Sequence, residues 1–239
     1  MSNTPENGAP TKRALIVGAG SGISAAFARA LAAEGYWVAL AARDTRKLAG
    51  LAQEVGARLF AVDAAEAAAV SELFARLDDG GGAIDVVLYN ASYRPRGPLI
   101  DLEPEEVAKS LAVTAYGAFL VGQQAAKRML PRGTGAIFFT GASASVKGYA
   151  GSAPFAMGKF ALRGLAQSMA REFGPRGIHI AHFVIDGGVR DPVRGRGDPA
   201  PEGSLLEPEA IAHTYMAVLK QPRSAWSLEV ELRPWVEKF

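Results

Sequence analysis

The sequence predicts an α/β fold, in which a doubly wound parallel sheet of about seven strands is covered by helices on both faces. The first observation is that short apolar runs alternate with longer Ala- and Leu-rich segments of helical period. The second is that runs such as LIV and VVLY are apolar throughout, as strands buried under two layers of helices require. The third is a Gly-rich turn that directly follows the first run.

Each element follows from this alternation in chain order. The strands are expected at Ala14–Val17, Trp37–Ala41, Arg58–Val62, Ile84–Tyr89, Ala136–Thr140, His179–Ile185 and Leu228–Leu232. Helices are expected at about Ile23–Glu34, Thr45–Glu54, Ala65–Leu77, Pro104–Leu130, Ser152–Phe173 and Pro208–Leu219. No linker interrupts the pattern, so we expect a single domain over residues 12–239. Residues 1–11 are polar, carry Pro and Gly, and predict a flexible tail without a secretion signal.

Composition narrows the classes of function. The chain has 239 residues, 49% of them hydrophobic, and no Cys, which excludes disulfides, thiolate metal sites and Cys nucleophiles. A reducing, cytoplasmic setting is therefore expected. The formal charge of +2 leaves little field to hold a polyanion, so we expect no nucleic-acid partner. No apolar run reaches the ~18 residues that span a bilayer, so no membrane partner is expected.

The Gly-rich turn reads Gly18-Ala19-Gly20-Ser21-Gly22-Ile23-Ser24 and leads straight from the first strand into a helix. Glycines let a backbone approach a pyrophosphate closely, and free amides at a helix N-terminus attract its charge. The turn therefore predicts a dinucleotide site. The alternative is a turn that needs Gly for its backbone angles alone.

The spacing Gly18-x-x-x-Gly22-x-Ser24 resembles the short-chain dehydrogenase/reductase family, whose turn reads G-x-x-x-G-x-G, and the resemblance covers essentially the whole chain. Here Ser24 replaces the third Gly. The resemblance implies a Rossmann-type NADP(H)-binding domain. The cofactor contacts that we expect on these grounds are Gly18, Ser21, Gly22, Ile23, Arg43, Asp63, Ala64, Asn90, Ala91, Lys159, Gly187 and Val189.

Two positions bear on which dinucleotide binds. Ala42 stands where an NAD-dependent relative would carry its acidic residue, and Arg43 follows it, which indicates NADP with Ser21 as a second phosphate contact. A merely solvated Arg43 is the alternative. Asp63 resembles the family's adenine-binding Asp, although a helix cap is an alternative interpretation. Asn90-Ala91-Ser92 resembles the family's Asn-Ala-Gly.

The expected catalytic positions depart from the family. Its Tyr-x-x-x-Lys motif, in which the ammonium lowers the pKa of the phenol, matches Phe155-Ala156-Met157-Gly158-Lys159, so Phe155 has no proton to give. The family's Ser, about thirteen residues earlier, falls on Ala142, and the neighbouring Ser143 is the candidate if the intervening loop is one residue shorter. The catalytic set inferred from the resemblance is therefore Lys159, Ser143 and Phe155.

Further departures lie at Thr114, where the family has Asn, and at Asp186-Gly187, where it has Pro-Gly. If the protein reduces carbonyls, another group has to supply the proton, and the candidates are Tyr93, Tyr116, Tyr149 and Asp186. A carboxylate after a strand, such as Asp186, more often caps a helix or accepts from backbone amides. For each Tyr, packing at a surface or interface is the commoner role. His179, His182 and His213 lack ligand spacing, so no metal is expected.

The irregular stretch from Arg190 to Ser204 predicts a loop over a site, on which Arg190, Arg194 and Arg196 either meet an anionic substrate or are solvated. The aromatic segment from Leu232 to Phe239 is expected to pack over the site or on a neighbouring subunit.

We therefore expect an NADPH-dependent oxidoreductase for a small carbonyl or activated alkene substrate. The alternative is a catalytically impaired NADP(H)-binding regulatory or sensor protein. The segments Pro104–Leu130 and Ser152–Phe173 resemble the helix pair through which family members dimerise, so a homodimer or homotetramer is expected.

Overall fold

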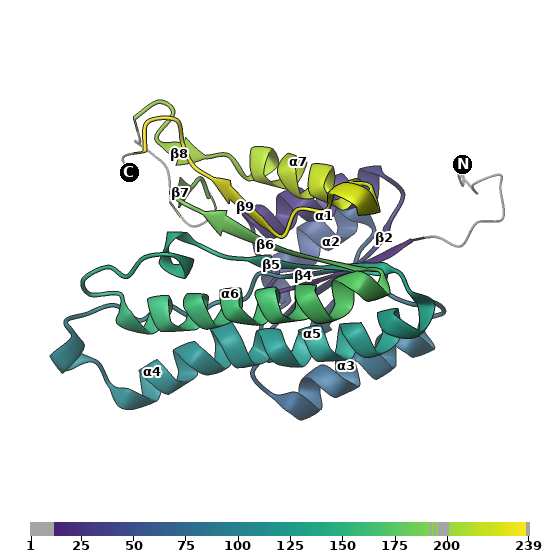
Figure 1. Cartoon of the computed structure of the whole chain (residues 1–239), viewed down its shortest axis with the longest axis horizontal. Helices are drawn as coiled ribbons and strands as arrows, with labels where there is room; N and C mark the ends of the chain where they lie inside the picture. The colour runs from purple at the N-terminus through teal and green to yellow at the C-terminus, as the bar shows by residue number, and fades with distance from the viewer. Residues whose placement is uncertain (1–11, 192, 194, 196–200, 238–239) are drawn as a thin grey trace.

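One seven-stranded parallel sheet runs through the centre of the computed structural model, which describes residues 12–191, 193, 195 and 201–237 (Figure 1). The strand order is β3-β2-β1-β4-β5-β6-β9. The strands are β1 (Arg13–Val17), β2 (Trp37–Ala42), β3 (Arg58–Ala61), β4 (Val86–Tyr89), β5 (Gly135–Thr140), β6 (Ile178–Ile185) and β9 (Glu229–Leu232). The order reverses at β1 and β4, and ligands of such sheets bind beyond the carboxyl ends of the strands at that point. The expected α/β class is confirmed.

Helices cover both faces of this sheet (Figure 1). One face carries α1 (Ile23–Ala33), α2 (Ala49–Val55) and α7 (Pro208–Leu219); the other carries α3 (Ala67–Asp79), α4 (Pro104–Leu111), α5 (Gly117–Met129) and α6 (Ala153–Phe173). The segment expected as one helix over Pro104–Leu130 is divided by a π-helical turn at Ala112–Tyr116. The helix expected from Thr45 begins at Ala49, after a 3₁₀ turn.

Two apolar cores lie against the two faces of the sheet. In β1, Leu15 and Val17 join the core under α3, α5 and α6, whereas Ala14 and Ile16 join the core under α1 and α7. All four side chains are at most 1% exposed. Because neighbouring residues of a strand point to opposite faces, a strand buried on both faces must be apolar throughout, as its sequence is.

A second, two-stranded parallel sheet joins β7 (Gly188–Val189) to β8 (Leu205–Leu206). Sequence reasoning missed both strands, because two residues are too few to carry a period. This pairing ties the two ends of the expected loop together. Arg194 and Arg196 of that loop, and the expected tail at residues 1–11, lie outside the described residues. No helix in the described part of the chain combines the length and apolar character needed to cross a bilayer.

Candidate cofactor and active site

The Gly-rich turn leaves the carboxyl end of β1 and packs against the end of β4. Gly18 adopts φ +80°, which L side chains rarely adopt, and its amide donates a 2.9 Å hydrogen bond to the carbonyl of Ala41. A Cβ at Gly18 would lie 2.3 Å from the amide nitrogen of Ala91. Glycine is therefore required here both for backbone angle and for the close approach of the two loops.

Ser24 and Asn90 brace this turn. The Ser24 hydroxyl donates to the Gly18 carbonyl at 3.2 Å, and Asn90 Nδ2 donates to Ser24 Oγ at 2.9 Å and to the Gly18 carbonyl at 3.3 Å. Ser24 is 1% exposed, so its hydroxyl is satisfied inside the protein. The departure from the family's third Gly thus adds a hydrogen-bonded link between β1 and β4.

The N-terminus of α1 faces this turn with unsatisfied donors. The helix begins at Ile23, directly after Gly22, and no side chain caps it. Among the described residues, no backbone carbonyl accepts from the amides of residues 20–24. Such amides carry the positive partial charge of a helix end and can hold an anion.

Arg43 and Asp63 follow β2 and β3 at the same edge. Arg43 is exposed, and the neighbouring Asp44 is held by a 2.8 Å ion pair to Arg46, whose hydrogen bonds lower the pKa of Asp44 to about 2. Asp63 Oδ1 accepts from the Ala65 amide at 3.0 Å. The carboxylate therefore closes the turn before α3 rather than capping that helix, whose N-cap residue is Glu66.

Lys159 is buried beneath the site. Its Nζ donates to the Thr140 carbonyl at 2.6 Å, and the side chain is 3% exposed. Burial disfavours the charged form and lowers the pKa of Lys159 to about 7. Phe155, one helical turn earlier on α6, has its ring centroid 5.6 Å from this nitrogen. The expected shared face of positions 155 and 159 is thus present.

Phe155 sits in a small apolar cluster with Ala144, Ala156 and the partly buried Ala142. Position 142, where the family's Ser falls by count, therefore borders the cluster that contains position 155. Ser143 begins a 3₁₀ turn and is half-buried, and its carbonyl accepts from the amides of Val146 and Lys147 at 3.0 Å. Its catalytic role stays a prediction.

A guanidinium also lies close to the ring of Phe155. The Cζ of Arg94, in the loop after β4, lies 4.6 Å from the ring centroid, and its Nη2 lies 3.5 Å from Ser152 Oγ. Sequence reasoning missed this residue because no local pattern links positions 94 and 155. The ring at the expected proton-donor position thus lies near two cationic side chains.

Thr114 is fully buried in the π-helical turn between α4 and α5. Its Oγ1 accepts from the Tyr93 amide at 3.3 Å. A Cβ at Gly158 of α6 would lie 2.9 Å from Thr114 Cβ, so the two helices touch here. Thr114 therefore has a packing role in addition to its expected place in the site.

The three candidate tyrosines have different surroundings. Tyr93 donates to the carboxylate of Glu106, and Tyr116 stacks on Phe119 with centroids 6.2 Å apart at the exposed surface. Tyr149 hydrogen-bonds with Lys147 and thereby raises the pKa of that ammonium.

The ammonium of Lys147 in turn lies 3.5 Å from Asp186 Oδ2, at the end of β6. Tyr149 thus adjoins an ammonium near the end of β6. Tyr93, after β4, also lies near one, since Lys109 Nζ is 4.7 Å from its ring centroid, but its hydroxyl donates to Glu106. Lys147 carried no signal in the sequence, because its two partners come from a loop and from a different strand.

Ser21, expected to contact phosphate, hydrogen-bonds to a carboxylate of the protein in this structure. Its hydroxyl lies 2.8 and 3.0 Å from the two carboxylate oxygens of Asp191, which follows β7 and is 7% exposed. The two residues are 170 positions apart, so sequence reasoning missed Asp191.

The C-terminal segment packs against residues at both ends of the same loop. A Cβ at Gly187 would lie 2.6 Å from Pro234 Cδ, and one at Gly203 would lie 2.3 Å from Trp235 Nε1. The segment thus packs beside Gly187, one of the expected cofactor contacts.

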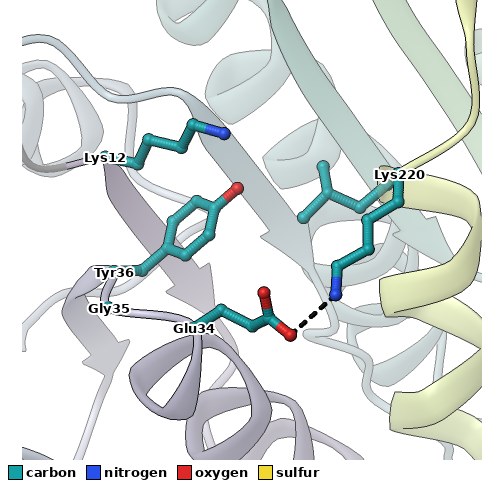
Figure 2. Close-up of a pocket in the computed structure, with 6 residues that line it drawn as sticks. Lys12, Glu34, Gly35, Tyr36 and Lys220 are labelled. Carbon is teal, nitrogen blue, oxygen red and sulfur yellow. Dashed lines mark hydrogen bonds and ion pairs between the residues drawn. The ribbon is translucent and has the colours of Figure 1, made fainter. Parts of the chain in front are cut away.

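A hollow of about 460 Å³ lies at the opposite edge of the sheet, near the amino ends of β1 and β2 (Figure 2). Lys12 and Tyr36 line it, and an ion pair of 2.6 Å joins Glu34 to Lys220 across it. It adjoins none of the expected cofactor residues. Among the described residues, no group of three or more His, Asp or Glu side chains could hold a metal ion.

Comparison with known proteins gives a consistent family. The family model described as short chain dehydrogenase matches residues 12–194. D-threitol dehydrogenase of Mycolicibacterium smegmatis is 32% identical over 71% of this chain and 67% of its own length. The cyclic-di-GMP-binding biofilm dispersal mediator protein of Escherichia coli is 31% identical over 87% of this chain and 82% of its own.

Among solved structures, the alcohol dehydrogenase of Thermococcus sibiricus complexed with 5-hydroxy-NADP superposes with a TM-score of 0.84. It is 27% identical, and the match covers 96% of this chain and 99% of that chain.

Proposed function

This chain belongs to the short-chain dehydrogenase family, and from that premise we propose that it is an NADPH-dependent oxidoreductase acting on a small carbonyl or activated alkene substrate. The observation that carries the proposal is the edge of β1 and β4, where the close-packed Gly18 turn presents uncapped α1 amides. This arrangement fits a dinucleotide, since it combines close backbone approach with positive partial charge. The Thermococcus sibiricus relative, complexed with 5-hydroxy-NADP, supports the choice of cofactor.

The residues at this edge would hold the cofactor along its length. The α1 amides would bind the pyrophosphate, and Arg43 would bind the 2′-phosphate, because a guanidinium matches phosphate geometry. Asp63 would accept from the adenine amino group through the oxygen that its own turn leaves available. Lys159 would donate to the nicotinamide ribose. The remaining proposed contacts, at the turn and at the nicotinamide end, are Gly18, Ser21, Gly22, Ile23, Ala64, Asn90, Ala91, Gly187 and Val189.

Bound NADPH would supply a hydride to carbon, and reduction of a carbonyl then requires one proton at its oxygen. Phe155 cannot give that proton. We propose Tyr149 as its source, because its phenol is exposed, hydrogen-bonds to the Lys147 ammonium, and lies in a loop that this ammonium joins to Asp186 at the carboxyl end of β6. Ser143 would donate a hydrogen bond to the same carbonyl oxygen.

The matched test compares Tyr149→Phe with Tyr36→Phe, which removes a phenol at the far edge of the sheet. NADPH consumption is followed by absorbance over a panel of ketones, diketones, aldehydes and activated alkenes. Losing a positioned general acid should lower kcat for the reduced substrate by about 10²-fold or more. The Tyr36→Phe enzyme should keep the wild-type rate. Equal rates in wild type and Tyr149→Phe would assign the proton to another group.

The missing hydroxyl at Phe155 favours a second candidate function. The protein would then be an NADP(H)-binding regulatory or sensor protein without turnover, and the relative from Escherichia coli is named for binding rather than for catalysis. Tight NADPH binding, together with no NADPH consumption over the whole panel, would favour this function over the oxidoreductase.

We also propose that the protein assembles as a homodimer or homotetramer through α5 and α6. Tyr116 and Phe119 stack on each other while 49% and 42% exposed, and Met157 and Phe160 are 50% and 45% exposed. Exposed apolar groups on adjacent helices favour association with a second copy, since a two-fold axis buries the same surface on both subunits.

A further inference from the structure

We propose that Asp191 sets the affinity of the cofactor site, because its carboxylate occupies the place at the Gly-rich turn that the pyrophosphate needs. The inference rests on the proposed NADPH function. It assigns to Asp191 a role that opposes binding: the anion of the cofactor has to displace an anion of the protein.

The position of this carboxylate is built by the fold. Asp191 follows β7, which is held in register by β8 through the pair Val189↔Leu206. The amide of Arg190 then donates to the Leu206 carbonyl at 3.0 Å, and the Arg190 guanidinium makes a 2.8 Å ion pair with Glu207. The residue immediately before Asp191 is thus fixed through backbone and side chain.

From this anchor the carboxylate reaches the turn. Its oxygens lie 2.8 and 3.0 Å from Ser21 Oγ, and a Cβ built on Gly22 would lie 3.8 Å from Oδ2. At 7% exposure the side chain is buried against the N-terminus of α1. A helix N-terminus stabilises an anion, and here a side chain of the protein already supplies one.

Two physical effects make the carboxylate and a bound pyrophosphate exclusive. A hydroxyl has one proton to donate, so Ser21 cannot donate to Asp191 and to a phosphate oxygen together. Two anions at this short range also repel each other. Because the site is partly buried, this repulsion is screened less than it would be in water. The cofactor therefore binds only after the carboxylate has moved from the turn.

The test measures the dissociation constant of NADPH by calorimetry in wild type and three variants. Asp191→Asn removes the charge and keeps the shape, whereas Asp191→Glu keeps the charge. Asp78→Asn is the matched control, since it removes one negative charge from an exposed ion pair with Arg128 on the α3 and α5 surface. Unfolding midpoints show whether each variant is folded, and Asp191→Ser replaces Asp191→Asn if that variant is not.

The expected result is that Asp191→Asn binds NADPH about tenfold or more tightly than wild type, which corresponds to about 1.4 kcal/mol. Asp191→Glu and Asp78→Asn should stay near the wild-type affinity. Equal NADPH affinities in wild type and Asp191→Asn would overturn the inference while leaving the NADPH site in place. Tighter NADPH binding by Asp191→Glu than by wild type would overturn it as well. If neither wild type nor any variant binds NADPH, the proposed function itself fails and the inference fails with it.

Discussion

Substituting Phe155→Tyr would restore a phenol at the position where the family carries its proton donor. The ring of Phe155 is 8% exposed, and its centroid lies 5.6 Å from Lys159 Nζ. The change adds one hydroxyl to the same ring, so we expect it to destabilise the fold by less than about 1.5 kcal/mol. It therefore alters the chemistry of the site with little change in packing.

The magnitude depends on Lys159 and on Ala142. Because burial lowers the pKa of Lys159 to about 7, this amine can carry its charge near neutral pH, and its charged form stabilises a tyrosinate. A positioned general acid contributes about 10²–10⁴-fold, or roughly 3–5 kcal/mol of barrier. Ala142 packs against the cluster that contains Phe155 and has no hydroxyl to polarise a carbonyl. We therefore expect a gain of at least ~10-fold in kcat, a conservative part of that range.

The assay follows NADPH absorbance with simple ketones and diketones in wild type, Phe155→Tyr and the control Phe160→Tyr. Phe160 lies on the same helix and is 45% exposed, so its new hydroxyl meets solvent. A wild type as fast as ordinary reductases of the family would refute the reasoning that position 155 limits the rate, and would show that another acid, for which Tyr149 is the proposed group, fully replaces the missing phenol. No gain in Phe155→Tyr, with no activity in wild type, would favour the binding protein instead.

The remaining predictions concern cofactor choice, pH and assembly. Arg43→Ala should lose the preference for NADPH over NADH, which we expect to be worth about 1.5–3 kcal/mol. Equal affinities of the wild type for NADPH and NADH in a calorimetric titration would refute the assignment of Arg43 to the 2′-phosphate. The folded pKa of Lys159 lies below its unfolded value of 10.5, so the unfolded chain binds more protons between pH 7 and 10.5. The free energy of unfolding should therefore rise with pH across that window, by about 1–3 kcal/mol in denaturant titrations, and Lys159→Met should remove this rise. Burial likewise lowers the pKa of His182 to about 4, so the free energy of unfolding should fall as the pH falls from 6.5 towards 4. The His182→Gln variant should show a smaller fall over the same pH range. Light scattering should give at least a dimer mass for wild type and a smaller mass for Phe119→Glu; a wild-type monomer at micromolar concentration would contradict the proposed assembly.

Sequence alone determined the features that depend on residues close together in the chain. The continuous apolar character of β1 requires burial on both faces, and Gly18 requires a backbone angle that other residues avoid. The four-residue spacing of Phe155 and Lys159 places both on one face of a helix wherever that helix lies. These predictions needed no knowledge of which strand neighbours which.

The π-helical turn shows where local pattern stops being sufficient. The segment over Pro104–Leu130 reads as one continuous helix, yet it is divided at Ala112–Tyr116. There the hydroxyl of Tyr89, from β4, donates to the carbonyl of Val113. That partner comes from the sheet and competes with the hydrogen bonds of a regular helix, so the helix residues themselves carry no sign of it.

Only the tertiary structure decided which polar groups meet at the site. Ser21 meets Asp191, Lys147 meets Asp186, and Arg94 covers Phe155. Each pair joins segments that follow or support different strands, and strand order and register bring those segments to one edge of the sheet. Their distance in sequence carries no information about their distance in space, because the crossover helices return every strand to the same starting edge.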